Sequence, residues 1–424
     1  MVKVKKRSIE SGAYIELAIA LIINFIIFST NNILMAYTKH LALIAVLLMI
    51  FDYFIRKQNS LIHLNAYKIL YLFFLVAIIS GSFFNSNLEP FLKYLIYFIL
   101  GTCMVYFKRE KLFYLYFLKI FKICFWIFIA SMFLESLSFN IFHKIFSFVS
   151  FGDAEMRVLT SGGAIAGVAF EKAYAAFLCN LGLGVLFSEY ISNKSIKSII
   201  EIILVMVALM MTGKRTLFLI PIALLLLYVL LFSKNNKLIR FSGICLIILV
   251  GIFLISVLVP SASLIIERLI DNGGDFLSGR ENFWEYAMEM FQQNPLLGKG
   301  FLSFNDYVYN RGFRYYGEMW NYQAHNVYIQ LLGETGIIGF SFFSILIIVL
   351  TKNVIKNAKK TKNFWDLLSV YWLILFASYS LTGNTLYYPC QLIVLFLCIL
   401  FINNREKSKN ISYKKRMKFK IYLS

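Results

Sequence analysis

The sequence predicts an all-α integral membrane protein with about twelve membrane-spanning helices. Of its 424 residues, 60% are hydrophobic and only 15% are charged, whereas a soluble domain has about 25% charged residues. The apolar residues gather in stretches of membrane-spanning length, and many basic residues gather between them. Composition, spacing and charge distribution therefore agree on a chain that is solvated largely by lipid.

A membrane-spanning helix needs roughly 20 mostly apolar residues to cross about 30 Å of hydrocarbon. Twelve stretches approach this length, and the shorter ones are expected to tilt or to continue into the interface. They are predicted at about 15–30, 41–55, 68–84, 91–107, 117–136, 171–189, 198–212, 216–233, 241–259, 335–351, 364–382 and 386–402.

The distribution of Lys and Arg predicts the orientation of these helices. Segments assigned to the cytoplasmic face hold 28 of the 42 Lys and Arg residues, in agreement with the enrichment of basic residues in cytoplasmic loops. Both termini are then expected to be cytoplasmic, and the basic tail is expected to lie along the inner leaflet. The net charge of +20 is therefore interpreted as a topology signal, not as the mark of a nucleic-acid partner.

Two outer segments are too long to be simple turns, and such loops usually carry function or are disordered. The first lies at about 137–170, within the part of the chain, 1–259, that holds the first nine helices. The second is a large periplasmic loop at 260–334, between helices nine and ten. Helices ten to twelve follow at 335–402, and the basic tail at 403–424 ends the chain. Because the large loop is rich in aromatic and charged residues, we expect it to be folded and partly helical.

Metal and disulfide chemistry is not indicated by the sequence. The six cysteines all lie in or beside apolar stretches, and no C-x-x-C pair occurs. They are interpreted as small buried hydrophobic side chains. The sequence also lacks an Asp-x-Asp pair, a His/Cys cluster with metal-ligand spacing, a nucleotide-binding fingerprint and a nucleophile elbow. We therefore expect metal-independent chemistry without a cofactor.

Charged residues are rare near the middle of the predicted helices. Those that occur in or beside these helices are predicted near helix ends, and they include Glu16, Asp52, Lys93, Glu171, Lys172 and Glu201. Because ionisable groups inside the membrane usually mark ion or proton pathways, this distribution disfavours a proton-coupled transporter. It directs attention to the outer rim of the helices.

The short turn Thr212–Thr216 connects helices seven and eight on the outer face and contains Lys214 and Arg215. Two cations on this face run against the basic-inside trend. They either reach lipid phosphates or form a cationic clamp for a diphosphate, for which a fixed guanidinium is well suited. The residues of the turn leave both interpretations open.

Another outer cation, Arg280, lies at a predicted helix start. Ser278 and Glu281 have the spacing of a capping box, and Asn294–Pro295 is expected to end the helix. The helix has an apolar stripe formed by Phe283, Trp284, Ala287, Met288 and Phe291. A helix N-terminus with a guanidinium beside it suits an anion, although Arg280 could instead pair with Asp275 or Glu281.

The segment that follows this helix combines glycines with aromatic residues. Gly298–Gly300 indicates a tight turn or a close approach of the backbone. The next stretch, 301–322, holds many aromatic residues, among them Trp320, together with Arg311 and Arg314. Aromatic rings with polar tips are typical both of sugar-binding surfaces and of the membrane interface, and the sequence favours neither.

The chain has four histidines, and only His325 lies beside a polar, arginine-containing outer loop. Histidine is the side chain best suited to take up a proton near neutral pH. The alternative is a histidine that is hydrogen-bonded at a helix start, since Asn326 and an apolar helix follow it. Taken alone, the residue type does not decide between these roles.

Taken in order, these motifs resemble the signature of the O-antigen ligase/polymerase superfamily. They are Gly279-Arg280, Trp284, Pro295, Gly298-x-Gly300, His325-Asn326-x-Tyr328 and Glu334-x-Gly336-x-x-Gly339. Upstream, Thr212–Thr216 resembles that family's arginine-containing turn. The segment from Arg157 to Ala176, with Glu171, resembles its earlier outer-loop motif more loosely.

The resemblance implies a GT-C-like membrane glycosyltransferase whose donor is a saccharide on undecaprenyl diphosphate. His325 would be the general base or would orient the acceptor, and Arg215 and Arg280 would stabilise the diphosphate as its charge develops. Arg157 would be a further cation on the opposite outer loop. The remaining substrate-binding positions would be Lys214, Arg311, Arg314, Trp320 and Tyr328, and supporting positions would be Asn326, Glu171 and Glu334. Lys214 departs from the family pattern, where a small hydroxyl residue is more usual.

Three functions are compatible with these motifs. The favoured one is a polymerase that joins repeat units of an O-antigen or capsule, since the long aromatic loop could hold two saccharides. A ligase that places finished polymer on lipid A-core would use the same donor and a different acceptor. A saccharide flippase or exporter would need a polar cavity through the helices, which are too apolar to indicate one. Expected partners are the lipid-linked donor, a saccharide or lipid A-core acceptor, membrane lipid and a chain-length regulator.

Overall fold

The computed structural model describes residues 2–30, 32–55, 65–84, 88–146, 164–169, 171–193, 196–232, 280–312 and 322–403. Within these ranges the chain forms helices and no strand, so the predicted all-α class is confirmed there. The helices are α1 (Val2–Phe28), α2 (Asn32–Ile55), α3 (Ala66–Phe84), α4 (Leu88–Tyr106), α5 (Lys111–Leu137), α6 (Phe139–Phe146), α8 (Lys172–Asn193), α9 (Ile196–Met211), α10 (Arg215–Phe232), α13 (Glu281–Gln293), α14 (Phe304–Asn310), α15 (Val327–Thr361), α16 (Phe364–Tyr379) and α17 (Pro389–Asn403).

Many of these helices have the composition of membrane-spanning segments. Among the described residues, the helices long and apolar enough to cross a membrane are Leu34–Ile55, Ala66–Phe83, Lys111–Leu137, Lys172–Ser192 and Val327–Thr361. Shorter apolar helices are Gly12–Phe28, Phe91–Tyr106, Arg215–Tyr228, Phe364–Tyr379 and Pro389–Ile402. The chain is thus a multi-pass membrane protein. The ninth predicted helix, 241–259, lies outside the described residues, so the number twelve stays a prediction.

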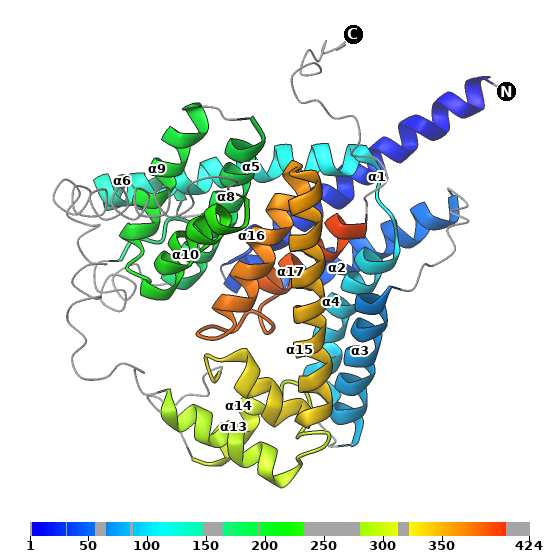
Figure 1. Ribbon diagram of the computed structural model, residues 1–424, viewed down its shortest axis with the longest axis vertical. Coiled ribbons are helices and arrows are strands. Elements are labelled where there is room, and N and C mark those ends of the chain that lie inside the picture. The colour runs from blue at the N-terminus through cyan, green and yellow to red at the C-terminus, as the bar shows by residue number, and fades with distance from the viewer. Residues whose placement is uncertain are drawn as a thin grey trace.

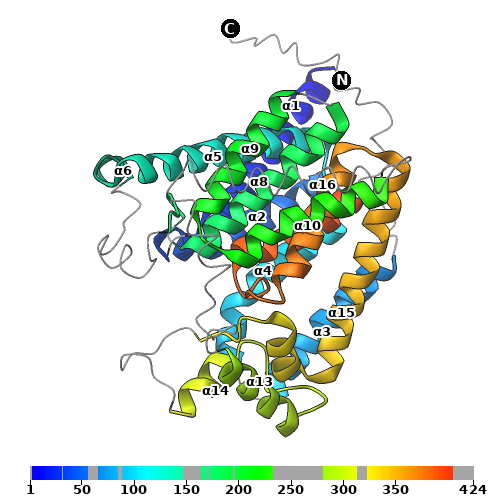
Figure 2. The ribbon, with the colours of Figure 1, turned by 60° about the vertical axis from the view of Figure 1, so that its left-hand side comes forward.

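The helices form one bundle with a smaller helical unit at one end. Figures 1 and 2 show α15 and α3 side by side along the bundle, with α13 and α14 gathered beside the start of α15. At the centre, α16 and α17 pack on each other; α16 also contacts α8 and α10, and α17 contacts α1 and α4. The large outer loop is therefore partly helical in its described part, as predicted.

The core of the bundle is built from large aromatic and aliphatic side chains. Trp372 of α16 is fully buried, packs against Phe117, Phe121 and Phe401, and donates its indole N–H to the Leu181 carbonyl at 3.0 Å. Buried amides supply further contacts between helices: Asn180 donates to the Leu217 carbonyl at 2.9 Å, and Asn24 donates to the Phe117 carbonyl at 3.2 Å. Such hydrogen bonds join helices where lipid offers no competing partner.

Several predicted boundaries change in the structure. The predicted outer loop at 137–170 begins with the short helix α6, whose polar and apolar residues alternate at helical spacing. The predicted helix 335–351 is part of the longer α15, because residues 327–334 continue into it across a kink at Gly336, where φ is 61°. The end of α16 at Tyr379 and the start of α17 at Pro389 leave a longer outer segment, 380–388, than the predicted gap of 383–385.

The stripe of the helix after Arg280 also differs in part from the prediction. Ala287 and Met290 of α13 are the fully buried residues, and Phe283 and Trp284 pack beside them. Met288, which the sequence assigned to the stripe, is 39% exposed. The reason is that α13 rests on α15 and α14 through a face centred on Ala287 rather than on the Met288 side.

A buried charge cluster occupies the end of the bundle that the basic residues assign to the cytoplasm. The guanidinium of Arg109 lies 3.3 Å from the Asp52 carboxylate and 3.7 Å from that of Glu16, and all three side chains are at most 1% exposed. Glu16 also accepts the backbone N–H of Glu110 at 3.2 Å. The sequence placed Glu16 and Asp52 near helix ends, whereas the structure buries both around one arginine.

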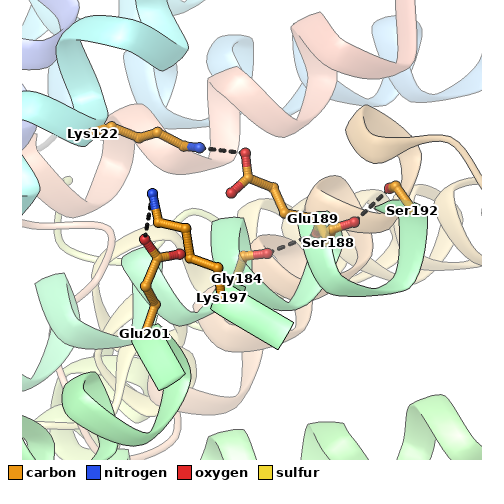
Figure 3. Close-up of polar contacts among 7 residues, drawn as sticks. All are labelled: Lys122, Gly184, Ser188, Glu189, Ser192, Lys197 and Glu201. Carbon is orange, nitrogen blue, oxygen red and sulfur yellow. Dashed lines mark hydrogen bonds and ion pairs between the residues drawn. The ribbon is translucent and has the colours of Figure 1, made fainter. Parts of the chain in front are cut away.

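More open polar contacts include an ion pair between α5 and α8 and a second ion pair within α9 (Figure 3). Lys122 of α5 pairs with Glu189 of α8. On α9, Lys197 lies 3.6 Å from Glu201, one helical turn away. Lys122 is 35% exposed and Lys197 82% exposed, so these pairs remain in contact with their surroundings.

Candidate active site

His325 lies in a short turn before α15, and hydrogen bonds hold the residues on both sides of it. Before it, the Ala324 N–H donates to the Gln330 side chain at 2.9 Å, and the Ala324 carbonyl accepts the indole N–H of Trp284 at 2.9 Å. After it, the Val327 N–H donates to the Ser380 carbonyl at 2.8 Å. The φ of His325 is 51°, a left-handed value that a residue with a side chain adopts only when its surroundings require it. The exposed His325 is therefore rigidly presented.

Asn326 begins the helix that follows His325. Its side-chain oxygen accepts the backbone N–H groups of Tyr328 at 3.1 Å and Ile329 at 3.3 Å. These bonds satisfy donors that the first turn of an α-helix leaves open. Asn326 thus fixes the direction in which α15 leaves the His325 turn, which fits the supporting position predicted for it.

Arg280 stands directly before α13, with Glu281 in the first turn of that helix. The half-buried guanidinium donates to the Thr382 carbonyl at 3.4 Å, a long bond, and no carboxylate among the described residues pairs with it. Burial lowers the pKa of Arg280, and the nearby Tyr379 opposes this shift. An arginine held by a single carbonyl has donors left for an anionic ligand.

The segment 380–388 between α16 and α17 connects the two predicted site residues. Its Thr382 carbonyl accepts from Arg280, its Asn384 amide lies 3.3 Å from Nδ1 of His325, and its Ser380 carbonyl accepts the N–H of Val327. Sequence reasoning missed this segment because it treated most of it as the ends of two apolar helices. The available signal was the small polar run around Thr382-Gly383-Asn384-Thr385.

The electrostatic surroundings of His325 are positive. Burial by the surrounding protein, which is the largest cause, and the charges of Arg280 and Lys214 together lower the pKa of His325 to about 4. Although part of the residue is exposed, the imidazole is thus close enough to both cations to be affected by them. His325, Arg280 and Lys214 therefore lie together, and the imidazole is neutral near pH 7.

The cationic turn between α9 and α10 has a defined local structure. Gly213 adopts a φ of 60°, and the Thr212 hydroxyl accepts the N–H of Lys214 at 3.3 Å. Lys214 and Arg215 are both half-buried, and Arg215 is the first residue of α10. The turn places Lys214 near enough to His325 for its charge to lower the pKa of the imidazole. That Arg215 also faces His325 stays a prediction.

Glu334 joins three segments that surround the site. Its carboxylate accepts the backbone N–H groups of Leu302 at 3.0 Å and Phe304 at 3.2 Å. It also accepts the hydroxyl of Tyr387 at 3.0 Å and the side-chain amide of Gln330 at 3.1 Å. Because Gln330 in turn holds Ala324, the buried carboxylate supports the His325 turn from behind, consistent with its predicted supporting role.

Two glycines allow the loop after α13 to enter the kink of α15. Gly298 has a φ of 68°, and an added Cβ would lie 2.3 Å from the Glu334 carbonyl carbon. A Cβ on Gly336 would lie 2.3 Å from the Leu296 carbonyl oxygen. Both positions are open only to glycine. The close backbone approach predicted for Gly298–Gly300 is confirmed.

The remaining predicted residues are placed less directly. The charge of Glu171 contributes to the raised pKa of Tyr388, the last residue of the segment 380–388, so Glu171 lies near that segment. Arg311 pairs with Glu289 at 2.7 Å and stacks over Tyr307. No described contact joins Arg311 to His325.

Tyr328 is used for packing between helices. Its hydroxyl donates to the Ala377 carbonyl at 3.1 Å, and its ring lies against Phe343. Its predicted contact with substrate, like that of Arg311, stays a prediction. Arg157, Arg314 and Trp320 lie outside the described residues.

The fold is that of a multi-pass membrane protein, and its described residues place two cations near a histidine. Residues 201–344 match the family model described as O-antigen ligase. The predicted resemblance to the O-antigen ligase/polymerase superfamily is confirmed over this region, which includes the cationic turn, α13 and the start of α15. No curated protein matches the chain.

Proposed function

We propose that the protein is a polysaccharide polymerase that joins repeat units carried on undecaprenyl diphosphate at the periplasmic face. The observation that supports this proposal is that the charges of Lys214 and Arg280, which come from two separate segments, both lower the pKa of His325. The donor carries a diphosphate, which is also the leaving group of the reaction. A cationic site can bind its phosphate oxygens and stabilise the negative charge that develops as it leaves. The basic segments at the opposite end support a cytoplasmic location for both termini in the inner membrane.

The transfer step forms one bond and breaks one bond. The hydroxyl oxygen of the acceptor sugar bonds to the anomeric carbon of the donor, and the bond from that carbon to the diphosphate oxygen breaks. Undecaprenyl diphosphate leaves with the electron pair, while Arg280 and Arg215 stabilise its growing charge. His325 orients the acceptor or takes up its proton. The step needs no metal ion.

A polymerase is favoured over a ligase by the outer unit of the molecule. The helices α13 and α14 form a small helical unit with its own buried core, beside the start of α15. Its aromatic side chains include Trp284, Tyr286 and Tyr307. Such rings are suited to sugars, and a surface of this length could hold a donor and an acceptor saccharide. A ligase would use the same cations with lipid A-core as its acceptor, and a flippase would need a polar path through the apolar core.

The test compares surface polysaccharide from a deletion strain with that from complemented strains. A polymerase predicts lipid A-core bearing a single repeat unit in the deletion. Bare lipid A-core with accumulated lipid-linked polymer would identify a ligase instead, and loss of all periplasmic repeat units would identify a flippase. His325→Ala should behave like the deletion while the protein stays in the membrane. His143→Ala on α6 is the matched control and should restore wild-type chains; normal chains from His325→Ala would contradict the proposed role.

A further inference from the structure

His325 has one polar side-chain neighbour that the sequence motifs did not identify, Asn384. The Asn384 residue is 4% exposed and belongs to the segment 380–388, outside the region that matches the ligase family. Its amide nitrogen lies 3.3 Å from Nδ1 of His325. The imidazole therefore has one ring nitrogen engaged by buried protein and leaves Nε2 for the substrate.

The direction of this contact follows from what surrounds the two ends of the amide. The nitrogen end meets Nδ1 of His325 and lies within hydrogen-bonding reach of the Tyr388 hydroxyl. The oxygen end is buried and has no hydrogen-bond partner among the residues that the structure describes. If the amide were turned over, its two N–H donors would occupy the position without an acceptor. Leaving two donors unsatisfied costs more than leaving one carbonyl oxygen unsatisfied, so the nitrogen faces His325.

We propose that Asn384 is a positioning residue that donates an N–H to Nδ1 of His325 and so fixes the imidazole as the tautomer with its hydrogen on Nε2. A nitrogen that accepts a hydrogen bond cannot carry the hydrogen of a neutral imidazole. The hydrogen-bond partner of one ring nitrogen thus determines whether the other ring nitrogen carries the hydrogen.

This tautomer decides between the two roles left open for His325. The Nε2–H group meets a substrate oxygen as a donor, so His325 orients substrate and does not take up the acceptor proton. The acceptor oxygen still bonds to the anomeric carbon, and the diphosphate still leaves with the electron pair. The proton of the acceptor hydroxyl then passes to the departing diphosphate, which becomes more basic as its charge grows.

The backbone around Asn384 is built to hold this geometry. The Asn384 carbonyl accepts the N–H of Tyr387, and the hydroxyls of Ser380 and Thr385 bond across the segment. Tyr387 is tied to Glu334, and Ser380 is tied to Val327 beside His325. The segment is thus joined to the His325 turn at two points and to Glu334 of α15 at a third, which keeps the amide and the imidazole in register.

The tautomer is measured by nitrogen NMR on the full-length protein, labelled with ¹⁵N-histidine and held in lipid nanodiscs. The chain has only four histidines, and the His325→Ala spectrum identifies the His325 signals by their loss. We expect Nδ1 to be unprotonated and Nε2 to be protonated in the wild-type protein. A wild-type signal from a protonated Nδ1 would overturn the proposal without any variant.

Two variants test the part played by Asn384. Asn384→Ala should give a mixture of tautomers, and Asn384→Asp, whose carboxylate only accepts, should move the hydrogen to Nδ1. Unchanged His325 signals in both variants would overturn the proposal. The signals of His40, His63 and His143 report whether the fold is kept, and Asn310→Ala on the exposed end of α14 is the matched control. Transfer should fall by about 10- to 100-fold in Asn384→Ala, as when the partner that orients a functional histidine is removed.

The inference rests on the proposed function only for its consequence in catalysis. The tautomer is measured by NMR and does not depend on catalytic activity. The role of His325 in transfer is measured from the polysaccharide made by a strain that carries His325→Ala. An inactive His325→Ala with a protonated Nδ1 would refute the tautomer alone. A fully active His325→Ala would refute the proposed catalytic role whatever the tautomer.

Discussion

Two buried arginines, Arg109 and Arg280, show how differently this molecule uses the same side chain. Arg109 lies between the carboxylates of Asp52 and Glu16, and none of these side chains is more than 1% exposed. Arg280 is half-buried at the other end of the bundle, where its hydrogen-bond partner is one carbonyl at 3.4 Å. Within the described residues, no carboxylate neutralises it.

This difference in partners distinguishes an arginine that stabilises the fold from one that can bind a ligand. A buried arginine that is paired with carboxylates is neutralised by them, and removing one partner leaves a buried charge without compensation. Arg280 has no carboxylate partner in the described part of the chain and lies near Lys214 and His325, so its charge is available to an anionic ligand. Substitutions at the two positions should therefore damage different properties.

The largest expected effect is on transfer in Arg280→Lys. An ammonium keeps the charge but loses the planar fork that fits two phosphate oxygens, and loss of one stabilising donor slows such reactions by about 100-fold or more. Polysaccharide synthesis in a strain complemented with Arg280→Lys should fall accordingly, with an unchanged amount of protein in the membrane. Normal chain synthesis would show that Arg280 is structural and would remove the contrast with Arg109.

Arg109→Ala should instead reduce the amount of folded protein. It leaves Glu16 and Asp52 buried without their arginine, which costs roughly 3–5 kcal/mol when one partner of a buried ion pair is removed. The measurement is the amount of protein in the membrane and the temperature at which the detergent-solubilised protein aggregates. Transfer per folded molecule should stay near the wild-type value.

The triple variant Glu16→Leu, Asp52→Leu, Arg109→Met is the control for this prediction. Replacing a whole buried ion group by apolar side chains is often neutral or stabilising, so the triple variant should recover stability relative to Arg109→Ala. If the triple variant is no more stable than Arg109→Ala, the charges have a role that the buried cluster alone does not explain.

The sequence predicted the outer cations and His325 because their signals are local. Arg280 lies next to a capping pattern and a helical stripe, and Lys214 and Arg215 stand between two apolar stretches. Each could be placed from its immediate neighbours. The match over residues 201–344 confirms the superfamily that these motifs indicated. The charges of Arg280 and Lys214 both lower the pKa of His325, so these residues lie near one another, and their roles in a site stay predictions.

The sequence did not reveal the contacts that depend on distant segments. Arg109, Asp52 and Glu16 come from three parts of the chain, and each on its own resembles a charge at a helix end. Asn384 lies in a polar run too short to stand out between apolar helices. Its relation to His325 requires the segment 380–388 to pack against the start of α15, which no periodic pattern encodes.

A smaller effect is expected where the loop after α13 enters the kink of α15. Gly298→Ala places a Cβ 2.3 Å from the Glu334 carbonyl carbon at a φ of 68°, so it should destabilise the protein by roughly 1–3 kcal/mol and lower transfer by shifting Glu334. Gly312→Ala is the matched control, because Gly312 has a φ of 83° but no atom within 4 Å of its added Cβ. Equal aggregation temperatures for the two variants would mean that the close approach to Glu334 is unimportant.

The smallest expected effect is at the partly exposed ion pair of Figure 3. Lys122 is 35% exposed and Glu189 is 13% exposed, so Lys122→Gln should cost less than about 1 kcal/mol, as is usual for accessible pairs. Lys197→Gln, at a more exposed pair with Glu201, should cost less still. Both variants should keep normal amounts of protein and normal transfer. If Lys122→Gln reduced the amount of folded protein as much as Arg109→Ala, exposed and buried ion pairs at the inner end of the bundle would matter equally for stability. The contrast between paired structural charges and charges kept for a ligand would then be supported only by the outer site.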